Sequence, residues 1–394
     1  MFSKVILALW SAAGLIWWMM AWRLVAGANR TGGARRNVIS EEHRLPALAT
    51  SPMLSVFKPL PPLSTHSLDL MSPGLESFVA QLDSRSEMLI GIHEQDREVI
   101  APLLERLQAG YPCAKLKVIF RADPDGVANP KIAWQRVLAE QAEGELWLWS
   151  DADIAAPSGF LQSARDEFAM CGAKMMTFPY VVRKIPSASA LLEALFVNVE
   201  FYPGVLLLRR LGPVDFGLGA AMLFRRDDFL QRVEWGEIGA WLADDFLLGQ
   251  KLRPVRIGEA TLETVPGALT WRQAVLHDLR WTKTIRWNRP VGSFARILIL
   301  PVLGWMVLVM LEPAHYFAWL GLLGMIQAEF LVTVEICRRL GCPLKLRDML
   351  CIEVWSFWRI ILWFVSWMPW PIFWSGRIWR GPRVEMAGRM TGET

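Results

Sequence analysis

The placement of apolar residues constrains this chain more than any other feature of its sequence. No charged residue occurs between positions 5 and 22, a stretch about as long as a bilayer-spanning helix. Further apolar stretches follow at residues 297–311, 316–334 and 350–374. The residues between these two ends have an ordinary soluble composition and are numerous enough for one substantial core. We therefore expect a soluble domain held at a membrane by apolar segments on both sides.

Arginines beside the apolar segments predict the orientation of the chain. Only Lys4 precedes the first segment, whereas four arginines follow it: Arg23, Arg30, Arg35 and Arg36. The positive-inside tendency then places the soluble domain in the cytosol, and the short break at residues 312–315 makes the next two segments a membrane hairpin with both outer ends on that side. Two alternatives stay open: a signal peptide cleaved near Ala26-Gly27-Ala28, and an interfacial or re-entrant course for residues 350–374, which contain Glu353 and Arg359.

Bulk composition limits the class of partner. The formal net charge of +4 is too small to indicate nucleic-acid binding, and no nucleic-acid partner is expected. The five cysteines form no CxxC pair and no zinc-like spacing, which favours reduced thiols. The expected partners are therefore the membrane and a small molecule.

The soluble middle alternates between strand-like and helix-like segments. Short apolar runs are followed by helical patterns of about ten residues; the runs are residues 54–57, 88–92, 117–120 and 145–149, and the patterns are residues 75–82, 99–109 and 132–141. This alternation predicts an α/β fold with a mostly parallel, doubly wound sheet. Ligands bind beyond the carboxyl ends of the strands in such sheets, so polar residues that follow strands are the candidates for a site.

Two pairs of aspartates are the first candidates. Asp151 and Asp153 follow the fourth strand, where they can hold a divalent cation, Mg²⁺ or Mn²⁺, that bridges the phosphates of a nucleotide-sugar; Asp153 could instead cap a helix. Asp244 and Asp245 open an apparent helix, where an acid is favoured by the helix dipole in any protein. Their functional interpretation is a general base that removes the proton of an acceptor hydroxyl.

Basic and aromatic residues supply the other candidates. Lys131 follows Asn129-Pro130, which suit a helix cap and first turn, and it could contact a donor phosphate or remain solvated. His277, Arg280 and Trp281 precede a membrane segment. They could contact phosphate and shape the acceptor site, or form a basic interfacial helix with an aromatic anchor.

The collinear order of these motifs resembles family 2-type glycosyltransferases with the GT-A fold, in particular the ceramide glucosyltransferase group and the bacterial hopanoid-biosynthesis-associated glycosyltransferases. The resemblance covers residues 55–290. Besides the motifs above, it rests on Val56-Phe57-Lys58-Pro59-Leu60 and Gly217-Leu218-Gly219-Ala220-Ala221-Met222.

The resemblance implies a role for each motif. Asp151 and Asp153 would be the metal and diphosphate acids, Asp245 the base of an inverting transfer, and Arg280-Trp281 the end of a (Q/R)xxRW motif. Two positions depart from the family pattern. Glu94 or Asp96 must replace the usual nucleoside-binding aspartate, and His277 stands where Gln or Arg is usual, although a protonated histidine could still donate to a phosphate.

The predicted organisation is an anchor at residues 1–26, a linker at 27–50, a cytosolic GT-A domain at 51–290, a transmembrane hairpin at 291–336 and a membrane-associated region at 337–394. The expected reaction moves glucose or N-acetylglucosamine from a uridine diphosphate sugar to a hydroxyl of a ceramide-like or hopanoid lipid. The resemblance implies a bacterial inner-membrane location. The alternatives are a polysaccharide synthase and a membrane-bound pseudoenzyme or assembly partner.

Overall fold

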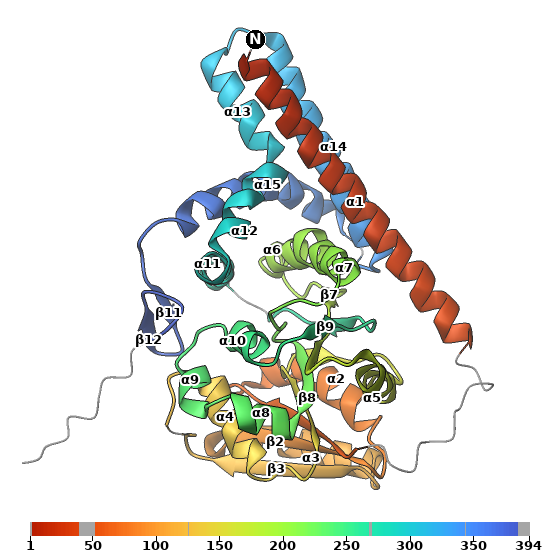
Figure 1. Ribbon diagram of the computed structural model, residues 1–394. Coiled ribbons are helices and arrows are strands. Elements are labelled where there is room, and N and C mark those ends of the chain that lie inside the picture. Colours follow the sequence, from red (N-terminus) through yellow and green to blue (C-terminus); the bar gives the residue numbers. More distant parts are fainter. Residues whose placement is uncertain (1, 39–51, 125, 268–269, 343, 385–394) are drawn as a thin grey trace, which may run out of the picture. The chain divides into compact units, whose positions relative to one another are not determined.

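The computed structural model describes residues 2–38, 52–124, 126–267, 270–342 and 344–384 (Figure 1). The chain forms two compact units. One comprises Met1–Thr50, Pro179–Leu211 and Glu263–Met368, and we call it the helical unit. The other comprises Ser51–Phe178, Gly212–Leu262 and Pro369–Thr394, and we call it the sheet unit. The residues predicted as one domain at 51–290 therefore contribute to both units.

The sheet unit is built on a seven-stranded sheet with the order β3-β2-β1-β4-β8-β6-β9. Its strands are β1 (Leu54–Pro59), β2 (Ser86–His93), β3 (Lys115–Arg121), β4 (Leu146–Ser150), β6 (Met175–Thr177), β8 (Ala221–Arg225) and β9 (Val255–Ile257). Strands β1 to β4 are mutually parallel, and β8 runs antiparallel to β4 and β6. The prediction of a parallel-rich α/β sheet is confirmed, with one antiparallel strand inserted.

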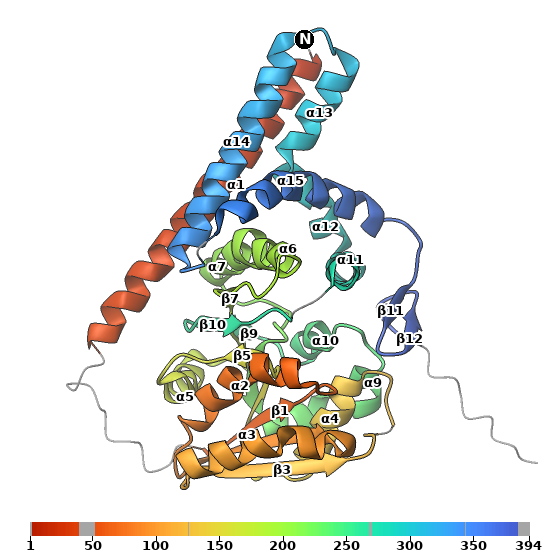
Figure 2. The same cartoon turned by 180° about the vertical axis from the view of Figure 1, so that it is seen from behind.

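Helices cover the sheet as parallel crossovers require. The helices are α2 (Thr65–Val79), α3 (Arg97–Gly110), α4 (Pro130–Ala139), α5 (Phe160–Cys171), α8 (Arg226–Arg232), α9 (Trp235–Gly239) and α10 (Asp244–Lys251), with a 3₁₀ turn η1 (Glu94–Asp96) (Figure 2). Because the chain goes from β1 to β2 and β3 in one direction and then returns past β1 to β4, the strand order reverses between β1 and β4. Such a reversal opens a crevice at the carboxyl ends of the two strands.

The sheet-unit core explains why the strands are so apolar. Strand β4 is buried along its whole length, and Trp147 and Trp149 pack beside Phe57 and Phe229. A strand buried on both faces becomes a continuous apolar run instead of an alternating one. The short strands β5 (Ile154–Ala155), β7 (Tyr180–Val182) and β10 (Leu262–Thr264) and the hairpin β11 (Ile372–Trp374) and β12 (Arg377–Trp379) complete the strand inventory of the described residues.

The helical unit contains the long apolar helices together with several short helical segments. They are α1 (Phe2–Val38), α6 (Ala190–Leu195), the π-helix η2 (Phe196–Phe201), α7 (Tyr202–Leu211), α11 (Trp271–Asn288), α12 (Pro290–Ala295), η3 (Arg296–Ile299), α13 (Pro301–Leu311), α14 (Tyr316–Arg339) and α15 (Leu346–Ser366). Within the described residues, four helices are long and apolar enough to cross a membrane: Val5–Ala28, Ala190–Leu211, Tyr316–Arg339 and Leu346–Ser366. Helix α1 continues to Val38, beyond the anchor end expected at residue 26.

Close packing joins the first and later apolar helices of this unit. An added Cβ on Gly14 of α1 would lie 2.5 Å from the Pro301 side chain, and one on Gly321 of α14 would lie 1.9 Å from Trp305. Small residues at such contacts let apolar helices approach where no hydrophobic effect drives them together. The Trp305 indole also donates a hydrogen bond of 2.9 Å to Ser11 Oγ. Helices α1, α13 and α14 therefore pack as a bundle, visible at one end of Figure 1.

Two of the predicted apolar segments differ from a single straight helix of the expected bounds. Residues 297–311 are not one continuous helix, because η3 ends at Ile299 and the segments on either side of Leu300 are bent by 63°. Pro301 is the cause, since proline disfavours helical geometry in the residue before it and removes a backbone donor. At residues 350–374 the chain forms a helix only as far as Ser366, and that helix is long and apolar enough to cross a membrane.

Candidate active site

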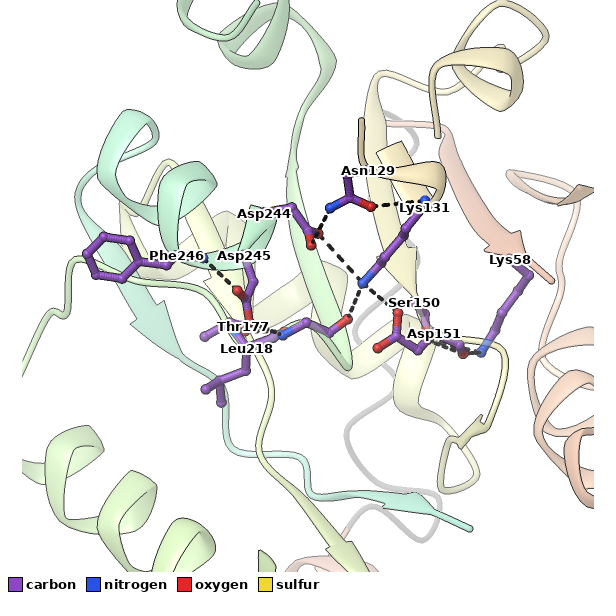
Figure 3. Close-up of polar contacts among 11 residues, drawn as sticks. Lys58, Asn129, Lys131, Ser150, Asp151, Thr177, Leu218, Asp244, Asp245 and Phe246 are labelled. Carbon is purple, nitrogen blue, oxygen red and sulfur yellow. Dashed lines mark hydrogen bonds and ion pairs between the residues drawn. The ribbon is translucent and has the colours of Figure 1, made fainter. Parts of the chain in front are cut away.

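Four sequence-predicted residues of the sheet unit lie together beside the carboxyl end of β4 (Figure 3). They are Asp151, Lys131, Asp244 and Asp245. Asp151 directly follows β4, and its amide donates to Ala220 O at 3.2 Å, which fixes the loop before β8 at the same edge. The strand-end argument that selected these residues therefore holds in three dimensions.

Lys131 is the centre of this cluster. Its Nζ lies 2.5 Å from Asp151 Oδ1 and 3.7 Å from Asp244 Oδ2, and it donates to Gly219 O at 3.3 Å. Although burial alone would lower it, the pKa of Lys131 is raised well above its usual range by Asp151 and then by Asp244. A permanently charged ammonium at this edge suits a phosphate ligand.

The start of helix α4 places Lys131. Asn129 caps the helix by accepting from Lys131 N at 3.0 Å, and Pro130 occupies the first turn, as predicted. The Asn129 amide also donates to Asp244 Oδ1 at 3.3 Å. One buried asparagine thus connects the lysine-bearing helix to the first acid of α10, a connection that sequence spacing did not indicate.

Asp245 is held in a geometry suited to a base. Its Oδ2 accepts from Gly219 N at 3.0 Å and its Oδ1 from Phe246 N at 2.8 Å. Burial, reinforced by the neighbouring Asp244 charge, raises the pKa of Asp245 to about 7, while Lys131 and the two amides act in the opposite direction. A carboxylate with a pKa near neutrality combines a useful ionised fraction with real basicity.

Lys58 and Gly219 are functional candidates to which the sequence assigned no role. Lys58 is fully buried, and its Nζ donates to Ser150 Oγ at 3.0 Å, Asp151 O at 2.8 Å and Ile154 O at 3.1 Å. All three ammonium protons are therefore used to hold the loop that carries Asp151 and Asp153. Burial lowers the pKa of Lys58 to about 7, against the opposing effects of Asp153 and Asp151.

Gly219 lies where three of these polar side chains meet. A Cβ added there would lie 3.4 Å from Asp245 Oδ2, 3.5 Å from Lys131 Nζ and 3.8 Å from Asp151 Oδ2, so the glycine leaves room at the meeting point of the polar side chains. Among the described residues, no group of three or more His, Cys, Asp or Glu side chains could hold a metal alone. One or two carboxylates suffice for Mg²⁺ when substrate phosphates and water complete its shell, so the donor set fits a cation that arrives with a diphosphate.

The two acids proposed for nucleoside binding have different surroundings. Glu94 is exposed and pairs with Arg97 at 2.7 Å, and hydrogen bonding to that guanidinium holds its pKa below the usual range. Asp96 is buried and accepts from Leu63 N at 2.9 Å, which ties η1 to the loop after β1. The nucleoside role stays a prediction for both.

His277, Arg280 and Trp281 lie on α11 in the helical unit. Trp281 packs between His277 and Phe196, with ring centroids 4.6 Å and 5.6 Å away. Burial, followed by the Arg280 charge, lowers the pKa of His277 to about 3, so the imidazole is neutral near pH 7. The donor-binding role of His277 stays a prediction, and with a neutral imidazole at that position Arg280 would supply the charge of the motif.

This fold and this cluster define the class of protein: a parallel-rich α/β enzyme with acids and a lysine gathered where the strand order reverses, which is the arrangement of a GT-A-type glycosyltransferase. The sequence matches the description "Glycosyl transferase family 21" over residues 7–384. The chain therefore belongs to glycosyl transferase family 21, the ceramide glucosyltransferase family. It is a glycosyltransferase that uses a nucleotide-sugar.

Several solved structures are distantly similar. A mannosyltransferase from Pyrobaculum calidifontis, in complex with GDP-Man and Mn²⁺, is 12% identical in sequence, with a TM-score of 0.46. The match covers 89% of this chain and 97% of the mannosyltransferase chain. S. aureus TarS 1–349 in complex with UDP-GlcNAc is 13% identical with a TM-score of 0.37, covering 83% of this chain and 95% of its own. No curated protein matches the sequence.

Proposed function

We propose that this chain transfers a sugar from a uridine diphosphate sugar, UDP-glucose or UDP-N-acetylglucosamine, to a hydroxyl of a membrane lipid, with inversion at the anomeric carbon. The observation that carries the proposal is the placement of Asp245. Two backbone amides fix its carboxylate beside Gly219, where Lys131 and Asp151 also converge.

The reaction needs one base and one leaving group. Asp245 takes the proton of the lipid hydroxyl as that oxygen forms a bond to the anomeric carbon, and the bond from this carbon to the diphosphate oxygen breaks. The products are a glycolipid, a nucleoside diphosphate and a protonated Asp245. A single displacement of this kind inverts the anomeric centre, because the acceptor attacks the face opposite the leaving group.

Lys131 and a divalent cation would stabilise the negative charge that develops on the leaving diphosphate. Asp151 and Asp153 would hold Mg²⁺ or Mn²⁺, which neutralises the developing negative charge when it is bound. Lys131 reaches the same place, since its Nζ already contacts Asp151 and Gly219. Three hydrogen bonds from Lys58 keep the Asp151 loop in place before the donor arrives.

A membrane lipid is the acceptor that the rest of the chain favours. Four described helices have the length and apolarity of membrane spans, and the helical unit also carries Trp281, which we propose as an acceptor-binding residue with Arg280 beside it. A ceramide-like or hopanoid alcohol fits such a setting. The arginines that follow the first apolar segment support a cytoplasmic position for the sheet unit, and we propose a bacterial inner membrane as the setting.

Transfer of label from radioactive nucleotide-sugars into chloroform-extractable lipid tests the proposal. Membranes containing the parent chain are compared with membranes containing Asp245→Asn, with several donors and supplied lipid alcohols. We expect metal-dependent label in lipid from the parent only. Label in water-soluble polymer would indicate a polysaccharide synthase, and label in neither fraction would indicate a pseudoenzyme.

A further inference from the structure

The chain segment that leads into Asp244 and Asp245 is bonded along both of its edges. On one edge it meets the cap of α4: Asn129 N donates to Gly239 O at 2.8 Å, and Asn129 Nδ2 donates to Trp241 O at 3.2 Å. These bonds link the segment to the helix that carries Lys131. The Ala240 carbonyl does not contribute to this edge, because it accepts from Val384 N.

The other edge is paired with the far C-terminal part of the chain. Leu242 N donates to Pro382 O at 2.9 Å, and Val384 N donates to Ala240 O at 2.9 Å. Trp241 and Arg383 face each other between these bonds as an antiparallel bridge. We call Pro382–Val384 the C-terminal segment; it lies in the sheet unit together with the residues it contacts.

The hairpin before this segment anchors it. Strands β11 and β12 pair in antiparallel register, and Trp379 at the end of β12 is fully buried. The Trp374 ring lies 6.0 Å from the Trp379 ring. The C-terminal segment therefore begins from a fixed point a few residues upstream.

Helix α10 depends on such external support because its own start is weak. Its N-cap is Ala243, which offers no side-chain acceptor to the first turn, and Phe246 N bonds to Asp245 Oδ1 inside that turn instead. Two acids are adjacent in that turn; burial is the main cause of the raised pKa of Asp245, and the charge of Asp244 raises it further. Contacts from Asn129 and Gly219 hold the two carboxylates, and the backbone that precedes them sets where the helix begins.

We propose that the C-terminal segment positions the catalytic acids, by pairing with Ala240 and Leu242 and so fixing the backbone that enters α10. This inference rests on the proposed function of Asp245 as the base. It gives the residues after the last apolar helix a role in turnover, in addition to any contact with the membrane.

Three substitutions in the full chain test this role. Val384→Pro removes the amide that donates to Ala240. Val384→Ala loses the side chain but keeps that amide. Arg383→Pro introduces a proline at the position whose amide donates to no described backbone carbonyl, because residues facing each other between the bonds of such a bridge do not bond to one another. The last two variants are matched controls.

Each variant is measured in the lipid-labelling assay for kcat and donor KM, and by titration with the nucleoside diphosphate. For Val384→Pro we expect kcat to fall roughly 10- to 100-fold, the scale of a displacement of about 1 Å at reacting groups. Donor KM and nucleotide affinity should stay within about twofold, because the Asp151 loop is untouched. Both controls should resemble the parent.

Parent-like kcat in Val384→Pro, alongside an inactive Asp245→Asn, would overturn the positioning role and leave the proposed function standing. Equal losses of kcat and nucleotide affinity would also overturn it, since they indicate general disruption of the sheet unit. If Val384→Pro does not accumulate, a chain ending at Gly381 removes both hydrogen bonds without adding a proline; retained turnover there would contradict the proposal. Activity in Asp245→Asn would instead remove the base assignment itself.

Discussion

The two units of this molecule bury charge in different ways. In the helical unit, Glu200 pairs with Arg296 at 2.5 Å and with Arg359, and Arg359 also pairs with Glu329. The two negative charges of this network are therefore matched by two positive charges. In the sheet unit, four carboxylates face two lysines: Asp151, Asp153, Asp244 and Asp245 against Lys58 and Lys131.

This difference indicates which buried charges stabilise the fold and which are available for chemistry. A balanced buried network fixes how helices pack, and breaking it leaves an uncompensated charge in an apolar setting. An excess of two negative charges in a largely buried cluster is costly until a cation or a positively charged group joins it. The carboxylates of the sheet unit are therefore arranged to bind a cation or a positively charged group. In the helical unit, each charged residue of the Glu200–Arg296–Arg359–Glu329 network already has a partner of opposite charge.

The largest expected effect is at Asp245. Asp245→Asn keeps the side-chain shape but removes the base, so we predict a loss in kcat of roughly 10²- to 10⁴-fold. Binding of the nucleoside diphosphate should persist, because the residues around Asp151 are unchanged. Near-normal turnover in this variant would remove Asp245 from the chemistry and make the charge imbalance a structural feature.

Breaking the balanced network should damage stability and spare donor binding. Arg359 is buried between Glu200 and Glu329, so Arg359→Leu removes the arginine partner of Glu329 and one of the two arginine partners of Glu200. We predict a destabilisation of about 3–5 kcal/mol, measured as a fall in the midpoint of thermal unfolding in detergent.

A matched variant sharpens that prediction. Arg359→Leu combined with Glu329→Gln removes charge from both sides and should recover part of the lost stability. Nucleotide affinity, measured on protein kept below the unfolding midpoint, should match the parent in both variants. A loss of nucleotide affinity without a change in the unfolding midpoint would contradict the division between the two units.

The pH dependence of turnover should report the pKa of Asp245. Because that pKa is raised to about 7, the carboxyl is protonated and inactive as a base at lower pH, and ionised above it. We predict that kcat falls by about tenfold per pH unit below pH 7 and levels off above it. A profile flat down to pH 5 would show that the free carboxylate is not required in that range.

The smallest expected effect is at His277. Its pKa of about 3 makes it neutral at the pH of turnover, so Gln, the residue usual in the family motif, replaces one neutral side chain with another. We predict that His277→Gln changes donor KM by less than about threefold, which corresponds to about 0.65 kcal/mol. A larger effect in kinetic measurements would mean that the imidazole contributes directly to donor binding.

Sequence reasoning succeeded where local pattern and strand ends decide the structure. Strands β1 to β4 lie within two or three residues of their predicted bounds, because buried parallel strands are continuous apolar runs. Asp151, Lys131 and Asp244 follow the strands or open the helices as predicted, and the strand-end rule brings such residues together.

Long-range contacts decided what the sequence could not show. A lysine within a strand predicts a solvent-exposed side chain. Lys58 is instead buried over the Phe78 ring, and it donates hydrogen bonds to a loop about 90 residues further along the chain. The bend before Pro301 had a signal, since proline was present in the apolar run. The pairing of Pro382 and Val384 with Ala240 and Leu242 had none, because backbone hydrogen bonds leave no trace in residue type.

Calorimetric titration of the purified chain with UDP, with and without Mn²⁺, tests most directly whether the charge imbalance marks a donor site. The parent is compared with Asp151→Ala and with Arg359→Leu. We predict metal-dependent binding by the parent, loss of the metal dependence in Asp151→Ala, and unchanged binding per folded molecule in Arg359→Leu. Binding that is indifferent to both the metal and Asp151 would contradict a cation–diphosphate site in the sheet unit.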